Sequence, residues 1–291
     1  MAARPKTLAA AAAPVLIGTG LASFRGAFRP LPALMALVGA LLIQIATNLA
    51  NDYYDFVRGA DTAERVGPVR VTQAGLLAPA AVWRAMVAVM MAAVLVGTYL
   101  VWVGGWPILL VGVLSLVCAV AYTGGPFPLA YLGLGDLFVF VFFGLVAVAG
   151  TFWVQARAFP LEALLAGVGV GALSTAILVV NNLRDLATDE RAGKRTLAVR
   201  IGRSATAVQY TFLLAVGVAV PVLGILVYGW PTVTAAAGLA TAAAYMTPLR
   251  TVWGHSDPRE LVPALGQTAR GVALYGILLA AALAWGLPRL G

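Results

Sequence analysis

Charge is what this sequence has least of. Only 10% of its 291 residues are Asp, Glu, Lys or Arg, whereas an ordinary soluble domain carries roughly a quarter. The single cysteine, Cys118, excludes a disulfide framework and a cysteine-based metal site. The single histidine, His255, excludes a metal site made of several histidines. Any metal chemistry in this chain must therefore rest on oxygen ligands.

Apolar residues are correspondingly abundant. They make up 62% of the chain and occur in runs of about 20, the length that an α-helix needs to cross a bilayer. Pro and Gly mark most of the joints between the runs. The pattern predicts an all-α polytopic membrane protein, a single domain over 1–291, with nine transmembrane helices at 7–24, 31–50, 80–103, 106–122, 133–154, 161–181, 207–228, 231–247 and 269–287.

The net charge of +8 is unevenly distributed over the predicted loops. With the N-terminus in the cytoplasm, fifteen of the 19 Lys and Arg residues fall on the cytoplasmic side. This bias is typical of the positive-inside rule. We therefore interpret the positive charge as a mark of membrane orientation and expect no nucleic-acid partner.

Two polar blocks interrupt the apolar pattern, and both lie on the predicted cytoplasmic side. The first, NLANDYYDFVRGADTAERVGPVR, covers 48–70, and the second, NNLRDLATDERAGKRT, covers 181–196. Each block follows an even-numbered span, and the two lie four spans apart. They resemble a weak internal duplication that places two acidic helix ends opposite each other.

Within each block, one asparagine and two aspartates fall on a single face if the helix continues into the block. The spacings are i, i+4, i+7 and i, i+4, i+8, given by Asn48, Asp52 and Asp55 in the first block and Asn181, Asp185 and Asp189 in the second. A simpler interpretation is that these are ordinary charged helix ends in water. The matched spacing in two blocks on one side of the bilayer favours a site.

Four carboxylates that converge at a membrane boundary repel one another and are costly to desolvate. Divalent cations remove both problems, and Mg²⁺ is typically held by one or two carboxylates together with substrate phosphates. Basic side chains of the same blocks are placed to grip a diphosphate, namely Lys194, Arg195, Arg65 and Arg70. The blocks thus predict metal-bridged binding of a diphosphate whose remainder is lipid-soluble.

A secondary transporter is the alternative from another class, because transporters also combine internal repeats with intramembrane charges. Transporter sites, however, lie near the bilayer midplane. The acids of the two blocks sit at span ends on one side, and we expect no buried Asp, Glu or Lys within the spans that would relay ions across. The pattern favours an enzyme.

These blocks resemble the two aspartate-rich motifs of the UbiA superfamily of intramembrane aromatic prenyltransferases. DTAERVGPVRVTQAG from Asp61, YTGGPFPLAYLGLGDLFVF at 122–140 and GKRTLAVRIG at 193–202 are similar to the branch that makes menaquinone. The wider superfamily places its next acid four residues after the second Asp. Here that position is Gly59, and Asp61 follows two residues later, which leaves the role of Asp61 less defined than those of Asp52 and Asp55.

The resemblance implies transfer of a polyprenyl group from a polyprenyl diphosphate to 1,4-dihydroxy-2-naphthoate, with decarboxylation, at a cytoplasm-facing site in the cell membrane. Other acceptors of the superfamily, such as homogentisate and 4-hydroxybenzoate, are the alternatives. The implied cofactor is Mg²⁺, with Mn²⁺ as a substitute. The implied metal ligands and catalytic acids are Asp52, Asp55, Asp185 and Asp189, with Asp61 as a further metal ligand.

Further polar residues of the motifs are candidates for binding the substrates. Amide side chains that position the acids or substrate oxygens are Asn48, Asn51 and Asn182. Aromatic faces stabilise an allylic cation in the manner of cation–π contacts, and Tyr122 and Tyr131 are candidates for this, although Tyr is also common at membrane interfaces. Asp136 is either the N-cap of the fifth span or part of the acceptor pocket.

Overall fold

The computed structural model describes residues 4–59, 66 and 70–286 of the chain, with no side-chain description for Pro5 and Lys6. Asp61 and Arg65 lie outside the described residues. The described part is helical, with the elements α1 (Pro5–Phe24), α2 (Pro30–Val57), α3 (Pro79–Gly104), α4 (Trp106–Ala121), α5 (Gly135–Phe140), the π-helix η1 (Val141–Val146), α6 (Ala147–Ala156), α7 (Leu161–Arg184), α8 (Leu186–Arg191), α9 (Leu197–Tyr228), α10 (Thr234–Gly254) and α11 (Pro258–Trp285).

Each predicted span coincides with a helical segment of the described chain, α5, η1 and α6 together forming the fifth. Seven of these segments are long and apolar enough to cross a membrane, and Trp106–Ala121 is a shorter apolar helix. Four helices extend well past their predicted ends. The helix α2 continues to Val57, α9 begins at Leu197 with a kink at Gly202, α10 continues to Gly254, and α11 begins at Pro258. The protein is an all-α polytopic membrane protein.

Proline and glycine set several helix ends. Pro30, Pro79 and Pro258 each open a helix, where the missing N–H has no partner to lose. The helix α9 ends at Tyr228 and is capped by Gly229, which adopts a φ of 67° that glycine tolerates at little cost. Pro30 and Gly229 mark joints that the sequence pattern predicted, whereas Pro258 opens α11 well before the predicted start at residue 269.

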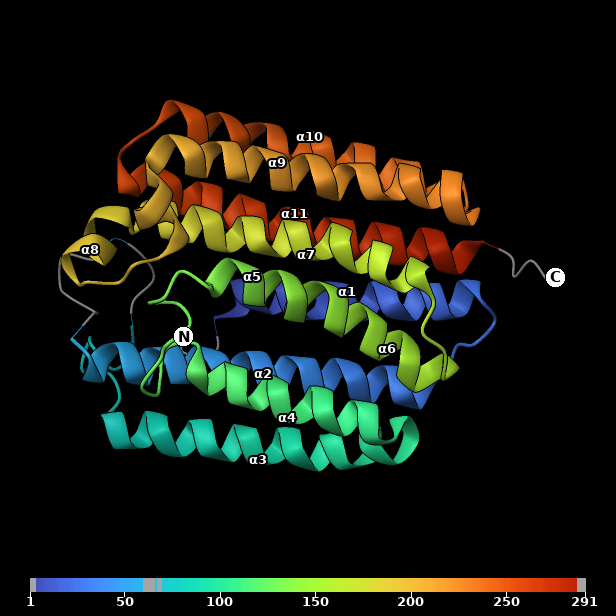
Figure 1. Ribbon diagram of the computed structural model, residues 1–291, viewed down its shortest axis with the longest axis horizontal. Helices are drawn as coiled ribbons and strands as arrows, with labels where there is room; N and C mark the ends of the chain where they lie inside the picture. Colours follow the sequence, from blue (N-terminus) through green and yellow to red (C-terminus); the bar gives the residue numbers. More distant parts are fainter. Residues whose placement is uncertain (1–3, 60–65, 67–69, 287–291) are drawn as a thin grey trace.

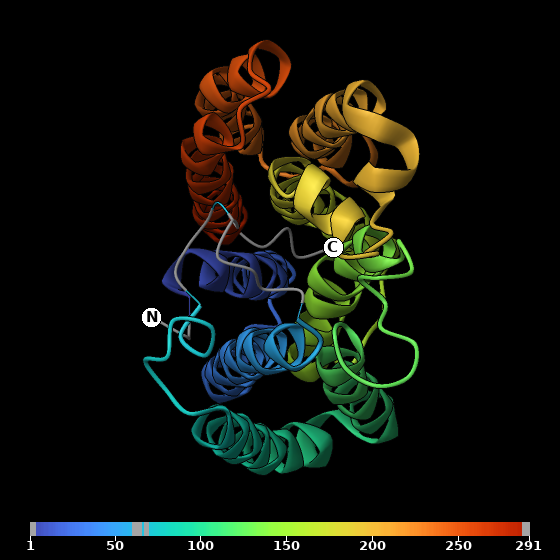
Figure 2. The same ribbon diagram turned by 90° about the vertical axis from the view of Figure 1, so that its left-hand side faces the viewer.

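The helices run roughly parallel to one another, and the two polar motifs lie at one end of the bundle (Figure 1). The largest apolar core is formed by residues of α1, α6, α7, α9, α10 and α11. By contrast, only 11% of the apolar window of α3 is buried. Viewed from the motif end, α3 lies at the edge of the bundle, as expected for a helix that faces lipid (Figure 2).

Glycines bring the fifth span against α7. A Cβ added to Gly144 would lie 2.5 Å from the carbonyl oxygen of Gly167 and 2.6 Å from Cα of Gly171. Small residues of this kind let membrane helices approach closely. Gly144 belongs to the π-helical turn 141–146, a feature that is frequent at functional sites. In this turn, Phe142 and Phe143 both line the internal cavity described below.

Candidate active site

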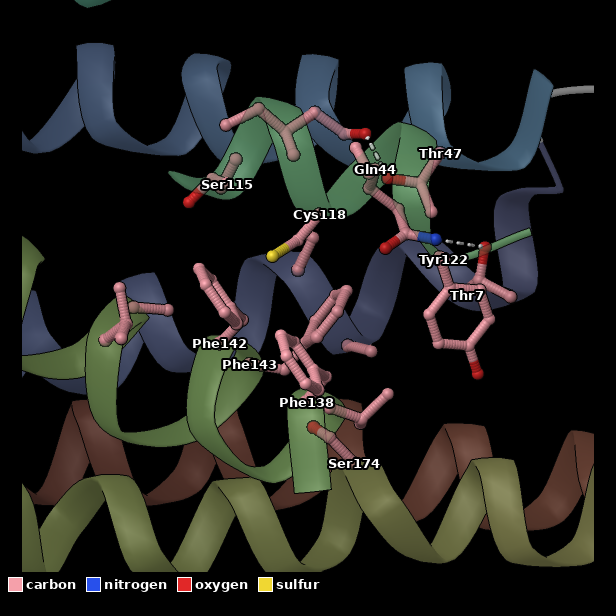
Figure 3. Close-up of a pocket in the computed structure, with 18 of the residues that line it drawn as sticks. Thr7, Gln44, Thr47, Ser115, Cys118, Tyr122, Phe138, Phe142, Phe143 and Ser174 are labelled. Carbon is pink, nitrogen blue, oxygen red and sulfur yellow. Dashed lines mark hydrogen bonds between the residues drawn. The ribbon is translucent and has the colours of Figure 1, made fainter. Parts of the chain in front are cut away.

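A cavity of about 1110 Å³ opens inside the bundle. Its apolar part includes Phe138, Phe142 and Phe143, which point into the same space as Cys118 and Tyr122 (Figure 3). The rings of Phe138 and Phe142 are stacked, with centroids 6.0 Å apart. Eight of the predicted site residues also line this cavity, namely Asn48, Asn51, Asp55, Arg70, Tyr122, Asp136, Asn182 and Lys194. The cavity therefore joins an apolar chamber to a polar end.

The first motif lies on the last turns of α2. The predicted span ended at residue 50, but α2 continues to Val57, which meets the condition for Asn48, Asp52 and Asp55 to share one face. All three are at most 3% exposed. The segment after the motif folds back onto it. Arg70 Nη2 donates to Asp55 Oδ2 at 2.9 Å, and the backbone N–H of Val71 donates to Asp52 Oδ2 at 3.2 Å. Both aspartates are thus held in place by residues 15 to 19 positions further along the chain.

The second motif departs from its predicted form. A continuous helix through Asp189 was expected, but α7 ends at Arg184, Asp185 caps it, and the short helix α8 follows. The bidentate ion pair of Arg184 with Asp185, at 2.7 and 2.6 Å, accompanies this break. The Asp189 N–H still donates to the Asp185 carbonyl at 2.8 Å, so both acids stay at the end of α7.

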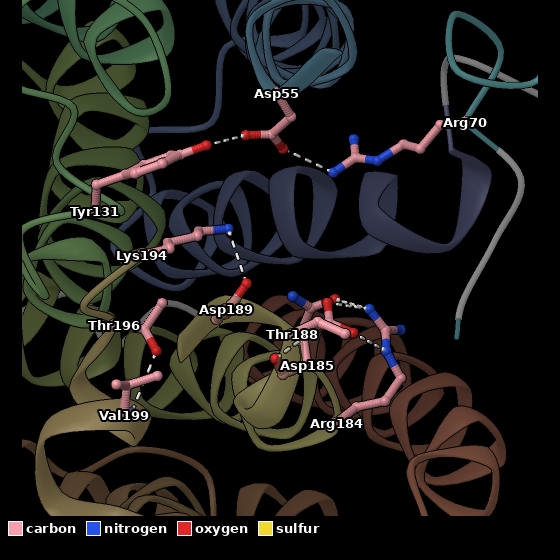
Figure 4. A network of polar contacts seen from close by, with 11 residues as sticks. Asp55, Arg70, Tyr131, Arg184, Asp185, Thr188, Asp189, Lys194, Thr196 and Val199 are labelled. Carbon is pink, nitrogen blue, oxygen red and sulfur yellow. Dashed lines mark hydrogen bonds and ion pairs between the residues drawn. The ribbon is translucent and has the colours of Figure 1, made fainter. Parts of the chain in front are cut away.

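The two motifs face each other across the polar end of the cavity, with Tyr131 and Lys194 between them (Figure 4). Tyr131 donates its hydroxyl to Asp55 Oδ1 at 3.1 Å. Lys194 Nζ lies 3.7 Å from Asp189 Oδ1 and 5.4 Å from the centre of the Tyr131 ring. Burial, together with the charge of Asp55, raises the pKa of Tyr131 above its usual value, so its hydroxyl remains a donor.

Polar contacts extend from the first motif deeper into the bundle. Gln44, one turn before Asn48, donates to Thr7 Oγ1 at 3.2 Å (Figure 3). It also donates to Asn48 Oδ1, at 3.1 Å. Asn48 also donates to Thr7 Oγ1, at 3.0 Å. One turn further along α2, Thr123 donates to Asn51 Oδ1 at 3.0 Å. These contacts fix both asparagines of the motif to neighbouring segments.

One candidate residue lies outside the cavity, and for another the structure decides between the two alternatives. Arg195 is exposed and is not among the residues that line the cavity, because its backbone, rather than its side chain, joins the site: its N–H donates to the Tyr131 carbonyl at 3.2 Å. Asp136 is not the N-cap of its helix, since Leu134 occupies that position. Asp136 is instead a buried cavity residue that accepts from Gln209 Nε2 at 3.0 Å.

Sequence reasoning did not identify several residues that shape the site. Gln209, Phe142 and Phe143 lie outside the quoted motifs, and Phe138 lies within the run 122–140 without a role assigned to it. Arg184 could have been identified from the sequence, because it directly precedes Asp185 within the second motif. A basic residue beside a buried acid at a span end is expected to pair with it.

The donor atoms at the polar end fit a hard divalent cation. They are carboxylate and amide oxygens from both motifs, the ligand type that Mg²⁺ prefers. In the described part of the chain, no three His, Cys, Asp or Glu side chains converge on one point. Mg²⁺ generally uses only one or two carboxylates and completes its shell with water and substrate phosphate. Asp52, Asp55, Asp185 and Asp189 are the residues that would hold it.

Together, the fold and the site define a helical membrane protein with two opposed carboxylate motifs at the polar end of an internal cavity. The chain belongs to the UbiA prenyltransferase family, whose sequence pattern matches residues 11–261.

The similarity of the chain to individual proteins agrees with this family assignment. The chain is 42% identical over 285 residues to 1,4-dihydroxy-2-naphthoate octaprenyltransferase of Mycobacterium tuberculosis, covering 98% of this chain and 96% of that protein. It is 38% identical to the Escherichia coli protein of the same name, covering 94% and 91%. A UbiA homologue from Archaeoglobus fulgidus, solved bound to DMAPP and Mg²⁺, has the same fold, with a TM-score of 0.66, 14% identity and coverage of 96% and 97%.

Proposed function

We propose that this protein transfers a polyprenyl group from a polyprenyl diphosphate to 1,4-dihydroxy-2-naphthoate, with loss of the ring carboxylate as CO₂. The observation that carries the proposal is the pair of opposed carboxylate motifs, each with a basic partner, at the polar end of an otherwise apolar cavity. The two relatives above are named 1,4-dihydroxy-2-naphthoate octaprenyltransferases, which supports the naphthoate as acceptor.

The diphosphate head binds at the polar end. Lys194 and Arg70, which line the cavity, supply the positive charge for its oxygens. Both are already paired with motif aspartates, at 3.7 Å for Lys194 and 2.9 Å for Arg70, and the incoming diphosphate competes for these contacts. The tail lies in the apolar chamber, where burial of each CH₂ stabilises the complex by roughly 0.8 kcal/mol.

The motif aspartates would hold Mg²⁺ in this complex. The A. fulgidus homologue of the same fold was solved with DMAPP and Mg²⁺ bound, which supports a role for a divalent cation. The bound cation neutralises the diphosphate and makes it a better leaving group. Asn48, Asn51 and Asn182 orient the carboxylates and substrate oxygens. Mn²⁺, which also prefers oxygen ligands, is expected to replace Mg²⁺.

The reaction needs no net proton transfer. The allylic carbon–oxygen bond breaks, and the ring carbon that carries the carboxylate bonds to the allylic carbon. The bond between that ring carbon and the carboxylate then breaks, which releases CO₂ and restores the aromatic ring. The chain must therefore hold the ring near the allylic carbon and keep water away from the cation. The Tyr122 and Tyr131 rings are the candidates for stabilising that cation, and the rings of Phe138, Phe142 and Phe143 in the cavity favour an aromatic acceptor.

Isotope labelling of the acceptor carboxylate tests the reaction. Membranes that contain the protein are given carboxyl-labelled 1,4-dihydroxy-2-naphthoate and farnesyl diphosphate, a short donor that offers the same allylic head. We expect the label in CO₂, an equal amount of pyrophosphate, and an unlabelled prenylated naphthalenediol, the reduced form of a demethylmenaquinone. A prenylated product that retains the label would contradict decarboxylative transfer.

The site is expected to face the cytoplasm from the cell membrane, because the basic residues gather at the same end as the motifs. A reporter fused after Arg200 should be cytoplasmic, and one fused after Gly291 should lie on the other side. Activity of alkaline phosphatase and fluorescence of a green fluorescent protein report the two sides in complementary ways. Both fusions on one side would contradict the nine-span topology.

A further inference from the structure

Within the described residues, Asp136 differs from Asp55, Asp185 and Asp189 in having no cationic partner. Asp55 pairs with Arg70, Asp185 with Arg184 and Asp189 with Lys194. No Lys, Arg or His in the described part of the chain forms an ion pair with Asp136. Asp136 is nevertheless buried, with only 8% of its surface exposed. A buried carboxylate without a charged partner is costly. Its retention on the wall of a substrate cavity indicates a contact made only when the substrate is bound.

The position of Asp136 is fixed by a neighbouring helix. Gln209 on α9 donates to Asp136 Oδ1 at 3.0 Å, and this contact joins residues 73 positions apart. Asp136 itself lies in the first turn of α5 and lines the cavity. With Oδ1 engaged by Gln209, the second carboxylate oxygen is the acceptor that remains for a ligand.

Asp136 also lies close to the reacting end of the cavity. A Cβ on the preceding Gly135 would lie 2.9 Å from the Tyr122 hydroxyl oxygen. Tyr122 and Asp136 line the same cavity, together with Asp55 of the first motif and Lys194 of the second. A ring bound beside Tyr122 would contact Asp136 on one side and the diphosphate site on the other.

The chemistry of the substrates decides which group Asp136 binds. The prenyl tail has no hydrogen-bond donor, and a carboxylate repels both the diphosphate and the carboxylate of the acceptor. Only the acceptor hydroxyls remain as donors. The 1-hydroxyl is adjacent to the acceptor carboxylate and forms an internal hydrogen bond with it, whereas the 4-hydroxyl is remote from the carboxylate and free to donate.

We propose that Asp136 accepts a hydrogen bond from the 4-hydroxyl of the aromatic acceptor and that Gln209 is its positioning residue. This contact turns the acceptor carboxylate away from Asp136. It also increases the electron density of the ring while the carbon–carbon bond forms, and the hydroxyl keeps its proton throughout. The inference rests on the proposed function, because it takes the dihydroxynaphthoate as the acceptor.

The test compares Asp136→Asn with the wild type in two measurements. The first is the KM of each substrate. A hydrogen bond to a charged group contributes roughly 1.5–3 kcal/mol, so the KM for 1,4-dihydroxy-2-naphthoate should rise about tenfold or more, while the KM for farnesyl diphosphate stays within about twofold. Gln209→Met should raise the acceptor KM by a smaller factor in the same direction.

The second measurement uses 1-hydroxy-2-naphthoate, which lacks the 4-hydroxyl, as a competitor for the acceptor. The wild type should bind it about tenfold more weakly than the dihydroxy compound, and Asp136→Asn should bind the two about equally. A purely structural role of Asp136 would not remove this discrimination. The matched control, Asp257→Asn, makes the same change at an exposed helix start far from the cavity lining and should behave as the wild type.

The inference is overturned if Asp136→Asn keeps the wild-type discrimination, or if both KM values rise equally. Should Asp136→Asn fail to reach the membrane, Gln209→Met carries the same two measurements, and unchanged discrimination there overturns the inference. A wild-type protein that does not prenylate the dihydroxynaphthoate at all contradicts the proposed function instead, so the two failures are distinguishable.

Discussion

Asp52→Ala and Asp185→Ala should each lower the rate of prenyl transfer by roughly 100-fold or more, the scale of losing one preorganised electrostatic group. Each removes a buried carboxylate from one of the two opposed motifs. The rate is measured with labelled farnesyl diphosphate on membranes whose content of the protein is matched by immunoblot. The loss should appear in kcat at saturating acceptor, because the acids act on the diphosphate and not on the ring.

A structural explanation of such a loss can be separated from a catalytic one. Removing Asp185 leaves the buried Arg184 without its partner, which itself destabilises a protein by a few kcal/mol. Asp185→Asn keeps the shape of the side chain and should lose activity to a similar degree at normal membrane levels. Glu190→Ala, an exposed acid in the same short helix α8, is the control and should retain full activity. Near-normal rates for both Asp52→Ala and Asp185→Ala would contradict the site.

Removal of divalent cations has the second large expected effect. EDTA should abolish turnover, and addition of Mg²⁺ in excess of the chelator should restore it, because the motif carboxylates and the diphosphate repel each other without a cation. Mn²⁺ should restore turnover as well. The measurement is the initial rate of pyrophosphate release over a titration of free metal. Full turnover in metal-free buffer would contradict a role for metal at the two motifs.

Much of the fold could be predicted from the sequence, because hydrophobic runs of bilayer length and Pro–Gly joints are local signals. The face shared by Asn48, Asp52 and Asp55 was also predictable, since the helical period places them together and α2 continues through them. The same argument was wrong for the second motif. There α7 ends at Arg184, where Arg184 binds the Asp185 carboxylate, a side-chain contact that periodicity does not contain.

Contacts between distant segments were beyond sequence reasoning. Arg70 was a candidate for binding diphosphate, but its pairing with Asp55 depends on how the chain folds back after α2. Gln209 lies in the apolar stretch of α9, and only the packing of α9 near α5 shows that it meets Asp136. The π-helical turn that places Phe142 and Phe143 in the cavity likewise has no local signal. The polar residues of the two motifs were therefore more predictable than the other residues that line the cavity.

Competition among acceptors for one labelled donor tests the central claim most directly. Membranes that contain the protein receive labelled farnesyl diphosphate, Mg²⁺ and equal concentrations of 1,4-dihydroxy-2-naphthoate, 4-hydroxybenzoate and homogentisate, and the labelled products are separated by chromatography. We expect the label in the prenylated naphthalenediol, with membranes lacking the protein as the blank. Prenylation of 4-hydroxybenzoate or homogentisate without prenylation of the naphthoate would contradict the proposed acceptor.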